Sequence, residues 1–245
     1  MRLTLRQKIT LAILSAYWVV LLIATHISIP KIVYQAGVSD KWLHFLAYMN
    51  LVFLLWFSIR PEDKVSWRSR LVWLLLLVVC ASGGLDELTQ PYFGRTCDLY
   101  DFLSNVVAII TGLLIVTFLS FWQALPAMLA ITIFGLTNLA KANLSNLVPI
   151  SDVLFHIFAY AGFTLCWIQF MRVYLPRITG IWRLLLIIDI PVCLLLVVKT
   201  ASLLSGRHFA ATDLLFAILG ICGVAIVSYL TGFIQLLPKP DLKGV

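Results

Sequence analysis

The sequence is poor in charge and contains no long polar stretch. Only 12% of its 245 residues are charged, whereas 62% are hydrophobic, and the mean hydropathy is +1.01. Soluble domains carry roughly 25% charged residues, and no polar stretch here approaches the ~50 residues that a separate soluble domain needs. These shortages exclude an ordinary water-soluble fold and predict an all-α membrane protein.

Cysteine motifs are also missing. The five cysteines are scattered without a Cys-x-x-Cys pair, and four of them lie inside apolar runs. We interpret them as small hydrophobic residues, and we expect from them neither disulfides nor a zinc site.

Eight apolar segments are long enough to cross a bilayer as helices, which takes ~20 residues each. The basic start and the first apolar run resemble a signal peptide. No small-x-small cleavage site ends this run, so we expect an uncleaved first helix. The predicted spans are 9–27, 42–59, 71–88, 102–120, 122–140, 153–171, 181–200 and 213–236.

Charge is distributed unevenly between the two sides that these spans define. With the N-terminus inside, the inner segments hold 12 of the 18 basic residues and three acidic ones, a net charge of +9. The outer segments hold six basic and seven acidic residues, a net charge of −1. The positive-inside rule therefore predicts that both the N- and the C-terminus are cytoplasmic. This distribution accounts for the net charge of +7 without nucleic acid, so we expect no nucleic-acid partner.

A pattern of polar residues occurs twice, 112 residues apart. The motif S-D-x-x-x-H-x-x-A-Y begins at Ser39 and again at Ser151. The same offset relates three further polar positions: Gly94 to Gly206, Arg95 to Arg207 and Asp101 to Asp213. Agreement of polar residues at one ungapped offset indicates an internal repeat.

The repeat predicts the architecture of the whole chain. Each copy contains four spans, an even number, so both copies insert the same way up. We predict two tandem, parallel four-helix units, residues 1–120 and 121–245, related by a pseudo-two-fold axis along the membrane normal.

Ionisable residues of the first unit gather near the predicted outer ends of its spans. Asp40, His44 and Tyr48 are spaced i, i+4, i+8 and share one helix face. Such residues usually face the interior of a bundle and mark function. Two further groups lie at the same level: Asp86, Glu87 and Gln90 at the end of the third span, and Arg95, Asp98, Asp101 and Asn105 around the start of the fourth.

This mixture of side chains is typical of a site for a polar headgroup. His44, oriented by Asp40, is a candidate for proton transfer, and Glu87 and Asp98 are further catalytic candidates. Arg95 is a candidate clamp for an anion. The other substrate-binding candidates are Asp86, Gln90, Asp101, Asn105, Tyr48 and, from the second unit, Arg207.

The second copy helps to separate site residues from scaffold residues. Asp, His and Tyr recur in it, which also suits a structural polar network. Five polar residues of the first copy do not recur: Asp86 aligns with Val198, Glu87 with Lys199, Gln90 with Ser202, Asp98 with Ala210 and Asn105 with Ala217. Residues present only in the first copy are the better candidates for a specific site.

Two other interpretations of these residues stay open. Asp98 or Asp101 would serve as the N-cap of the fourth span. His44, Glu87 and Asp98 would hold a metal ion, although their spacing is no known ligand motif, so we assign no metal ligand and no cofactor.

Two runs of polar residues in the first unit carry a family resemblance. They read Asp40-Lys41-x-x-His44-Phe45-x-x-Tyr48 and Asp86-Glu87-x-x-Gln90-x-x-Phe93-Gly94-Arg95-x-x-Asp98-x-x-Asp101-x-x-x-Asn105. In order and spacing they resemble the VanZ-like family of bacterial membrane proteins, over roughly residues 9–120. The glycine usual after the asparagine is Ala108 here. The second unit resembles a diverged VanZ-like copy.

The resemblance implies a multi-pass protein of the bacterial cytoplasmic (inner) membrane that acts at the cell envelope. The family is linked to resistance to the lipoglycopeptide teicoplanin. We expect a protein that binds or acts on a lipid-linked, anionic or glycosylated headgroup on the extracytoplasmic side, with membrane lipids, a lipid-linked glycan or a lipoglycopeptide as partners. A lipid transporter or flippase, and a non-catalytic scaffold for a lipophilic antibiotic or a partner protein, stay open, as does enzymatic activity.

Overall fold

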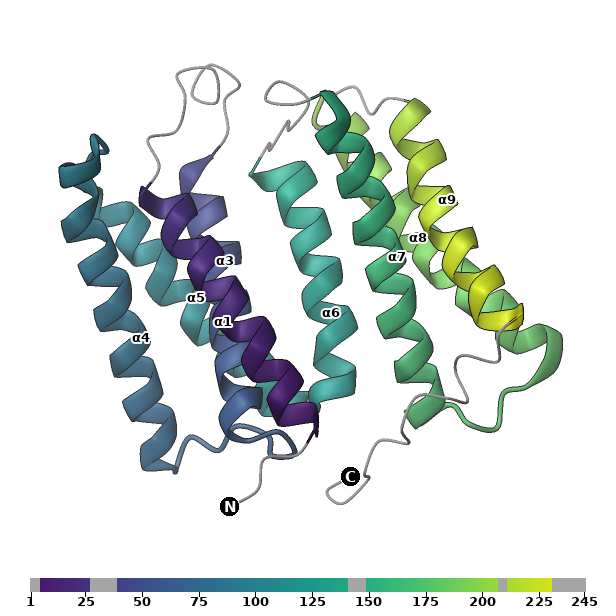
Figure 1. Ribbon diagram of the computed structural model, residues 1–245, viewed down its shortest axis with the longest axis horizontal. Coiled ribbons are helices and arrows are strands. Elements are labelled where there is room, and N and C mark those ends of the chain that lie inside the picture. The colour runs from purple at the N-terminus through teal and green to yellow at the C-terminus, as the bar shows by residue number, and fades with distance from the viewer. Residues whose placement is uncertain (1–4, 27–38, 141–148, 207–210, 231–245) are drawn as a thin grey trace. The chain divides into compact units, whose positions relative to one another are not determined.

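The computed structural model describes residues 5–26, 39–140, 149–206 and 211–230, and these residues form helices and short connections without a strand. Eight helices are long and apolar enough to cross a membrane, which confirms the expected all-α, multi-pass class (Figure 1). The helices are α1 (Leu5–His26), α3 (Asp40–Ile59), α4 (Arg70–Thr89), α5 (Leu99–Phe118), α6 (Phe121–Phe134), α7 (Pro149–Tyr174), α8 (Gly180–Leu204) and α9 (Ala211–Leu230).

The predicted spans agree with these helices in number and order but are shorter at several ends. Helix α5 begins at Leu99 instead of residue 102, because Asp98 caps it by accepting a hydrogen bond from the backbone N–H of Tyr100. A count of apolar residues misses such polar first turns, where a side chain satisfies a free backbone N–H. The part of the predicted span 213–236 that follows Leu230 lies outside the described residues.

Two short irregular helices follow α4 and α6. The 3₁₀ helix η1 (Gln90–Phe93) ends at Gly94, whose φ of 77° lies in the left-handed region that favours glycine. The π-helix η2 (Gly135–Leu139) continues α6, and only together do they form a helix long enough to cross a membrane, Phe121–Leu139. The first of these turns carries Gln90 and leads to Arg95.

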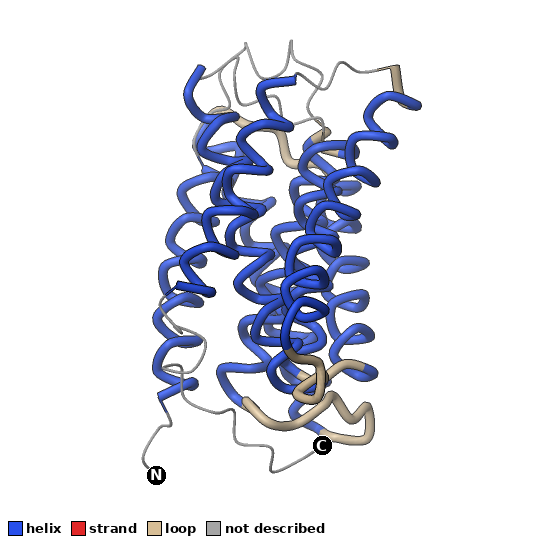
Figure 2. Tube along the Cα trace, turned by 90° about the vertical axis from the view of Figure 1, so that its right-hand side faces the viewer, coloured by secondary structure: helices blue, strands red, loops and turns tan. Residues whose placement is uncertain are grey.

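The described residues divide into two compact units, and the division falls inside α6 between Ala124 and Leu125. In the first unit α3 packs most extensively against α5 and also contacts α1, while α4 packs on α5. In the second unit α7 packs most extensively against α9. Within the first unit the helices lie alongside one another (Figures 1 and 2), so the C-terminal ends of α1 and α4 meet the N-terminal ends of α3 and α5.

Glycine permits the closest helix contact in each unit. A Cβ added to Gly112 would lie 2.4 Å from Val52 Cγ1 and 3.0 Å from the carbonyl oxygen of Met49, so only glycine lets α5 approach α3 this closely. In the second unit, a Cβ at Gly220 would lie 2.4 Å from the carbonyl oxygen of Ile157. These contacts fix the distance between the two helices that are central to each unit.

We predict that Gly112→Ala and Gly220→Ala each lower the free energy of unfolding by about 1–3 kcal/mol, the usual cost of overpacking. Gly162→Ala in α7 is the matched control, because its added Cβ meets no atom within 4 Å. This control should be neutral or stabilising by up to about 1 kcal/mol. Unfolding of the purified protein in detergent micelles measures all three. Equal stability of all three variants would contradict the packing described here.

Candidate functional site

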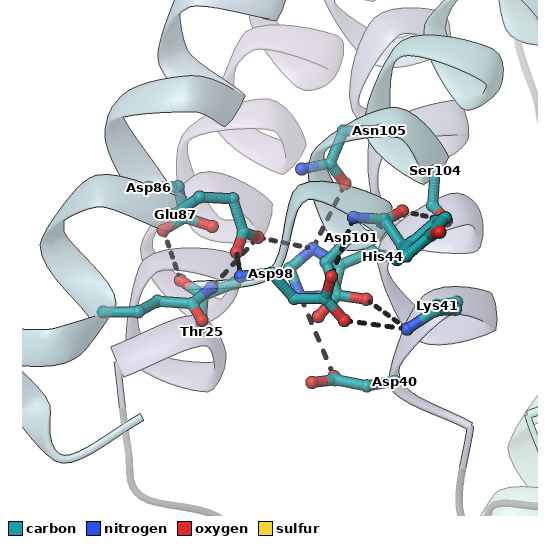
Figure 3. Close-up of polar contacts among 12 residues, drawn as sticks. Thr25, Asp40, Lys41, His44, Asp86, Glu87, Asp98, Asp101, Ser104 and Asn105 are labelled. Atoms are coloured by element: carbon teal, nitrogen blue, oxygen red, sulfur yellow. Dashed lines mark hydrogen bonds and ion pairs between the residues drawn. The ribbon is translucent and has the colours of Figure 1, made fainter. Parts of the chain in front are cut away.

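The ends of four elements bring polar residues together at one end of the first unit (Figure 3). All the candidates predicted in this unit take part in this group, which we call the polar cluster. Its members are Thr25 and His26 of α1, Asp40, Lys41, His44 and Tyr48 of α3, Asp86, Glu87 and Gln90 at the end of α4, Arg95 and Asp98 between η1 and α5, and Asp101 and Asn105 of α5. The remaining candidate, Arg207, lies outside the described residues.

His44 lies at the centre of the polar cluster and contacts residues of its own helix α3 and of α4 and α5. Its Nδ1 atom lies 3.1 Å from Asn105 Oδ1 and 3.5 Å from Glu87 Oε1, and its Nε2 atom lies 3.7 Å from Asp40 Oδ1. The side chain is only 3% exposed. The predicted pairing of His44 with the carboxylate one turn earlier is therefore present, and Glu87 faces the other ring nitrogen.

Asp86 and Glu87 are two neighbouring carboxylates, and both are buried. Glu87 accepts hydrogen bonds from Gln90 Nε2 at 3.2 Å and from the backbone N–H of Asp98 at 3.4 Å. Asp86 accepts one from Thr25 Oγ1 at 2.8 Å. Within the described residues neither carboxylate is paired with a lysine or an arginine. Their charge is met only by histidines and neutral donors, an arrangement that is costly in an apolar surrounding.

Arg95 already has a carboxylate partner. It donates through Nη2 to Asp40 Oδ2 and through Nη1 to the carbonyl oxygen of Thr25 at 3.0 Å, and its side chain is only 7% exposed. The guanidinium group thus ties α1 to α3. A phosphate could be clamped by Arg95 only by displacing Asp40, so the predicted role of Arg95 as an anion clamp has a competitor within the chain.

Lys41 and Asp98 form the exposed edge of the polar cluster, and Lys41 also reaches the buried Asp101. Lys41 Nζ lies 3.0 Å from Asp98 Oδ2 and 3.4 Å from Asp101 Oδ1, and the lysine side chain is about half exposed. Asp98 Oδ1 also accepts the backbone N–H of Tyr100 at 2.8 Å, so Asp98 is the N-cap that the sequence allowed. The Tyr100 N–H, followed by the Lys41 ammonium group, holds the pKa of the Asp98 carboxyl below its usual range.

Three buried polar atoms of the cluster have no hydrogen-bond partner among the described residues: Asp86 Oδ2, Gln90 Oε1 and Asn105 Nδ2. Buried polar atoms in folded proteins are usually bonded. Gln90 and Asn105 are completely buried, and Tyr48, also buried, lies with its ring beside Gly83 at the same level. Unused donors and acceptors here indicate a site with capacity to hold a further group.

Among the described residues of the second unit, the positions that align with Asp86 and Asn105 are apolar, whereas Lys199 and Ser202 stand at the positions of Glu87 and Gln90. Val198 and Ala217, which align with Asp86 and Asn105, lie with Tyr160 in a hydrophobic core. His156 Nδ1 lies 2.8 Å from the carbonyl oxygen of Asp152 in its own helix. The polar cluster is therefore a property of the first unit in the described part of the chain.

Three members of the polar cluster, Thr25, His26 and Lys41, are not among the site residues predicted from the sequence. Lys41 belongs to the family motif but received no role there, although it stands next to Asp40. Thr25 donates to Asp86 and accepts from Arg95, 61 and 70 residues away. No periodicity or spacing marks a threonine at the end of an apolar span, so no signal in the sequence pointed to it.

Comparison of the chain with protein-family models, curated proteins and solved structures gave no match. The resemblance to the VanZ-like family therefore stays a prediction that rests on the motif residues.

We predict that the contribution of Asp98 to stability depends on pH. Because its pKa is lower in the folded protein than the ordinary value of 3.8, ionised Asp98 stabilises the fold above that value. The contribution disappears as the pH falls through the lowered pKa. Asp98→Ala should therefore unfold at a lower temperature than the wild type at pH 7, and the gap should shrink towards pH 3. Asp98→Asn keeps the cap and should lose less. A gap that does not change with pH would contradict this assignment.

Proposed function

We propose that this chain is a multi-pass protein of the bacterial cytoplasmic membrane, with both termini in the cytoplasm, whose polar cluster faces outwards. The charge distribution supports this orientation, because it gives the inner side +9 and the outer side −1. In this orientation the cluster lies at the level of lipid headgroups. Its proposed role is to bind, and through His44 to act on, the headgroup of a lipid-linked or glycosylated envelope ligand.

We also propose that the chain is a tandem repeat of two VanZ-like units, residues 1–120 and 121–245, inserted in parallel. Two further observations at the offset of 112 support it. Gly94 and Gly206 both have positive φ, 77° and 70°, and α3 packs on α5 as α7 packs on α9. The second unit serves as scaffold, since it lacks both carboxylates and has Val198 and Ala217 in a hydrophobic core at the positions of Asp86 and Asn105.

The charge of the polar cluster favours a glycosylated headgroup over an anionic one. Among the described residues, the five carboxylates of the cluster lie beside only two lysine or arginine side chains, Lys41 and Arg95, and both of these are engaged. The carboxylates are those of Asp40, Asp86, Glu87, Asp98 and Asp101. Carboxylates and amide oxygens accept hydrogen bonds, so they suit sugar hydroxyls or an ammonium group and repel phosphate. This excess of carboxylates is the observation that carries the proposal.

The position of His44 suits proton transfer if the headgroup reacts. The imidazole ring lies between Asp40 and Glu87, and Asn105 holds the ring in place. A transport path is less well supported, because the described polar cluster is confined to one end of the unit. Deeper in α3, Asn50 donates to the carbonyl oxygen of Leu46 in its own helix.

We predict that the purified protein binds a glycosyl diacylglycerol, or teicoplanin, at least roughly tenfold more tightly than phosphatidic acid, a difference of about 1.4 kcal/mol. Glu87→Gln and His44→Gln should each weaken sugar-lipid binding about tenfold or more, because each removes a charge-assisted contact. Binding to protein in lipid nanodiscs measures these affinities.

Asp63→Asn is the matched control for this experiment. Asp63 is an exposed carboxylate that pairs with Arg60 outside the polar cluster, so its loss should not change binding. Tighter binding of phosphatidic acid would contradict the proposed headgroup chemistry. Loss of folded protein in Glu87→Gln and His44→Gln would instead favour a purely structural polar network.

We predict that Cys97 reports the proposed orientation. This exposed cysteine lies between η1 and α5 beside the polar cluster. A membrane-impermeant maleimide should label it in intact cells, and Cys97→Ser should abolish the signal. Ser66→Cys, placed in the Cys97→Ser background and in the connection between α3 and α4, should be labelled only after permeabilisation. The reverse pattern would overturn the orientation.

A further inference from the structure

We propose that the polar cluster holds a divalent transition-metal ion, Zn²⁺ or Mn²⁺, ligated by His44, Asp86 and Glu87. This inference goes beyond the proposed function and does not depend on it, because a metal ion would tie α3 to α4 whatever the headgroup. One ligand atom from each of the three buried residues lies within 4.8 Å of the other two. Among them, His44 Nδ1 and Glu87 Oε1 are 3.5 Å apart. Tetrahedral ligands at 2.0–2.2 Å from one ion lie roughly 3.3–3.6 Å apart.

The charge of the three residues calls for a cation. Asp86 and Glu87 are 7% and 2% exposed, adjacent in sequence, and without a lysine or arginine partner among the described residues. Buried charges are generally paired or coordinate a metal. A divalent ion would neutralise both carboxylates at once, which no single side chain of the cluster does.

Unused acceptor atoms at the same place point independently to a ligand. Asp86 Oδ2 and Gln90 Oε1 are buried and have no hydrogen-bond partner in the described structure, and Gln90 is completely buried. The amide nitrogen of Gln90 donates to Glu87 Oε1 at 3.2 Å, so its free oxygen stands beside the three ligands. Two free oxygen acceptors in this cluster suit a cation.

The surroundings of His44 fit those of a metal-bound histidine. A ligating imidazole usually donates its other ring N–H to a carboxylate. With Nδ1 on the ion, Nε2 carries the proton and faces Asp40 Oδ1 at 3.7 Å. Arg95 holds the same aspartate through its other oxygen. Nδ1 then exchanges its contact with Asn105 for the metal ion.

A second group of three residues, Asp40, His44 and Asp101, is also close enough to hold an ion, but its charges are already met. Arg95 pairs with Asp40, and Lys41 pairs with Asp101. An ion there would have to compete with two cationic side chains. His44, Asp86 and Glu87 are therefore the better set, and Asp40 is a positioning residue.

The donor set selects the metal. One imidazole and two carboxylates suit Zn²⁺ or Mn²⁺, whereas Ca²⁺ and Mg²⁺ prefer oxygen ligands alone, and no thiolate is present in the set to favour Cu⁺. Three protein ligands leave at least one coordination position for water or for a ligand hydroxyl.

The test is metal binding by the full-length protein in nanodiscs after treatment with EDTA and dialysis. Titration with Zn²⁺ and with Mn²⁺, followed by elemental analysis, should give one tightly bound ion per chain. The double variant Asp86→Asn/Glu87→Gln should weaken binding more than about 100-fold, and Asp40→Asn by about 10- to 100-fold. Asp63→Asn, which removes an exposed carboxylate outside the cluster, should bind as the wild type does.

Co²⁺ supplies a readout that does not depend on affinity or on the stability of the double variant. The Co²⁺-loaded protein should show visible d–d absorption bands, and these bands should shift in His44→Gln as nitrogen is lost from the ligand set. Circular dichroism and gel filtration establish that each variant is folded. No bound ion, or an ion bound equally well by the folded double variant, would overturn the metal site.

The metal site and the proposed function can be overturned independently of each other. Headgroup binding measured in EDTA, together with no metal binding, would overturn only the metal site. One tightly bound ion that the double variant loses, without any preference for a sugar lipid, would uphold the metal site and overturn only the proposed function.

Discussion

Two adjacent buried carboxylates, Asp86 and Glu87, impose the constraint on which the rest of this site depends. Ionised oxygens in an apolar surrounding are stable only where donors surround them. Here the donors come from four directions: Thr25 at the end of α1, His44 on α3, Gln90 in η1, and the backbone N–H of Asp98 before α5. Each donor group must lie at the same level along its helix as the two carboxylates, so these hydrogen bonds fix the positions of four helix ends relative to one another.

The fold brings these donors together through short connections and one close approach. Gly112 lets α5 lie against α3, which places Asn105 beside His44. The left-handed turn at Gly94 redirects the chain after η1, so that Arg95 reaches back to α1 and Asp40. Two kinds of interaction result: Asp86 and Glu87 are left with histidines and neutral donors, while Lys41 and Arg95 hold Asp40, Asp98 and Asp101. This separation is what favours a cationic or hydroxyl-rich ligand.

Much of this arrangement was predictable from the sequence, because it follows from helical spacing. The lengths of the apolar segments predicted the eight helices, and the i, i+4 spacing predicted the pairing of Asp40 with His44. The residues without polar counterparts in the second copy included Asp86 and Glu87. The pairing of Arg95 with a carboxylate of the chain was not predictable. Whether a guanidinium group is free depends on which carboxylate the fold brings near, and Asp40 lies 55 residues away. The role of Thr25 was not predictable either, since one hydroxyl group at the end of an apolar segment does not alter the hydropathy pattern.

The central claim is that His44 and Glu87 interact across α3 and α4. A double-mutant cycle with His44→Gln, Glu87→Gln and the combined variant measures this interaction directly, as unfolding free energies in detergent micelles with EDTA at pH 7. We expect a coupling free energy of about 0.5–3 kcal/mol, the range for residues in contact within one polar network. Additivity of the two substitutions within about 0.3 kcal/mol, the behaviour of distant sites, would contradict it.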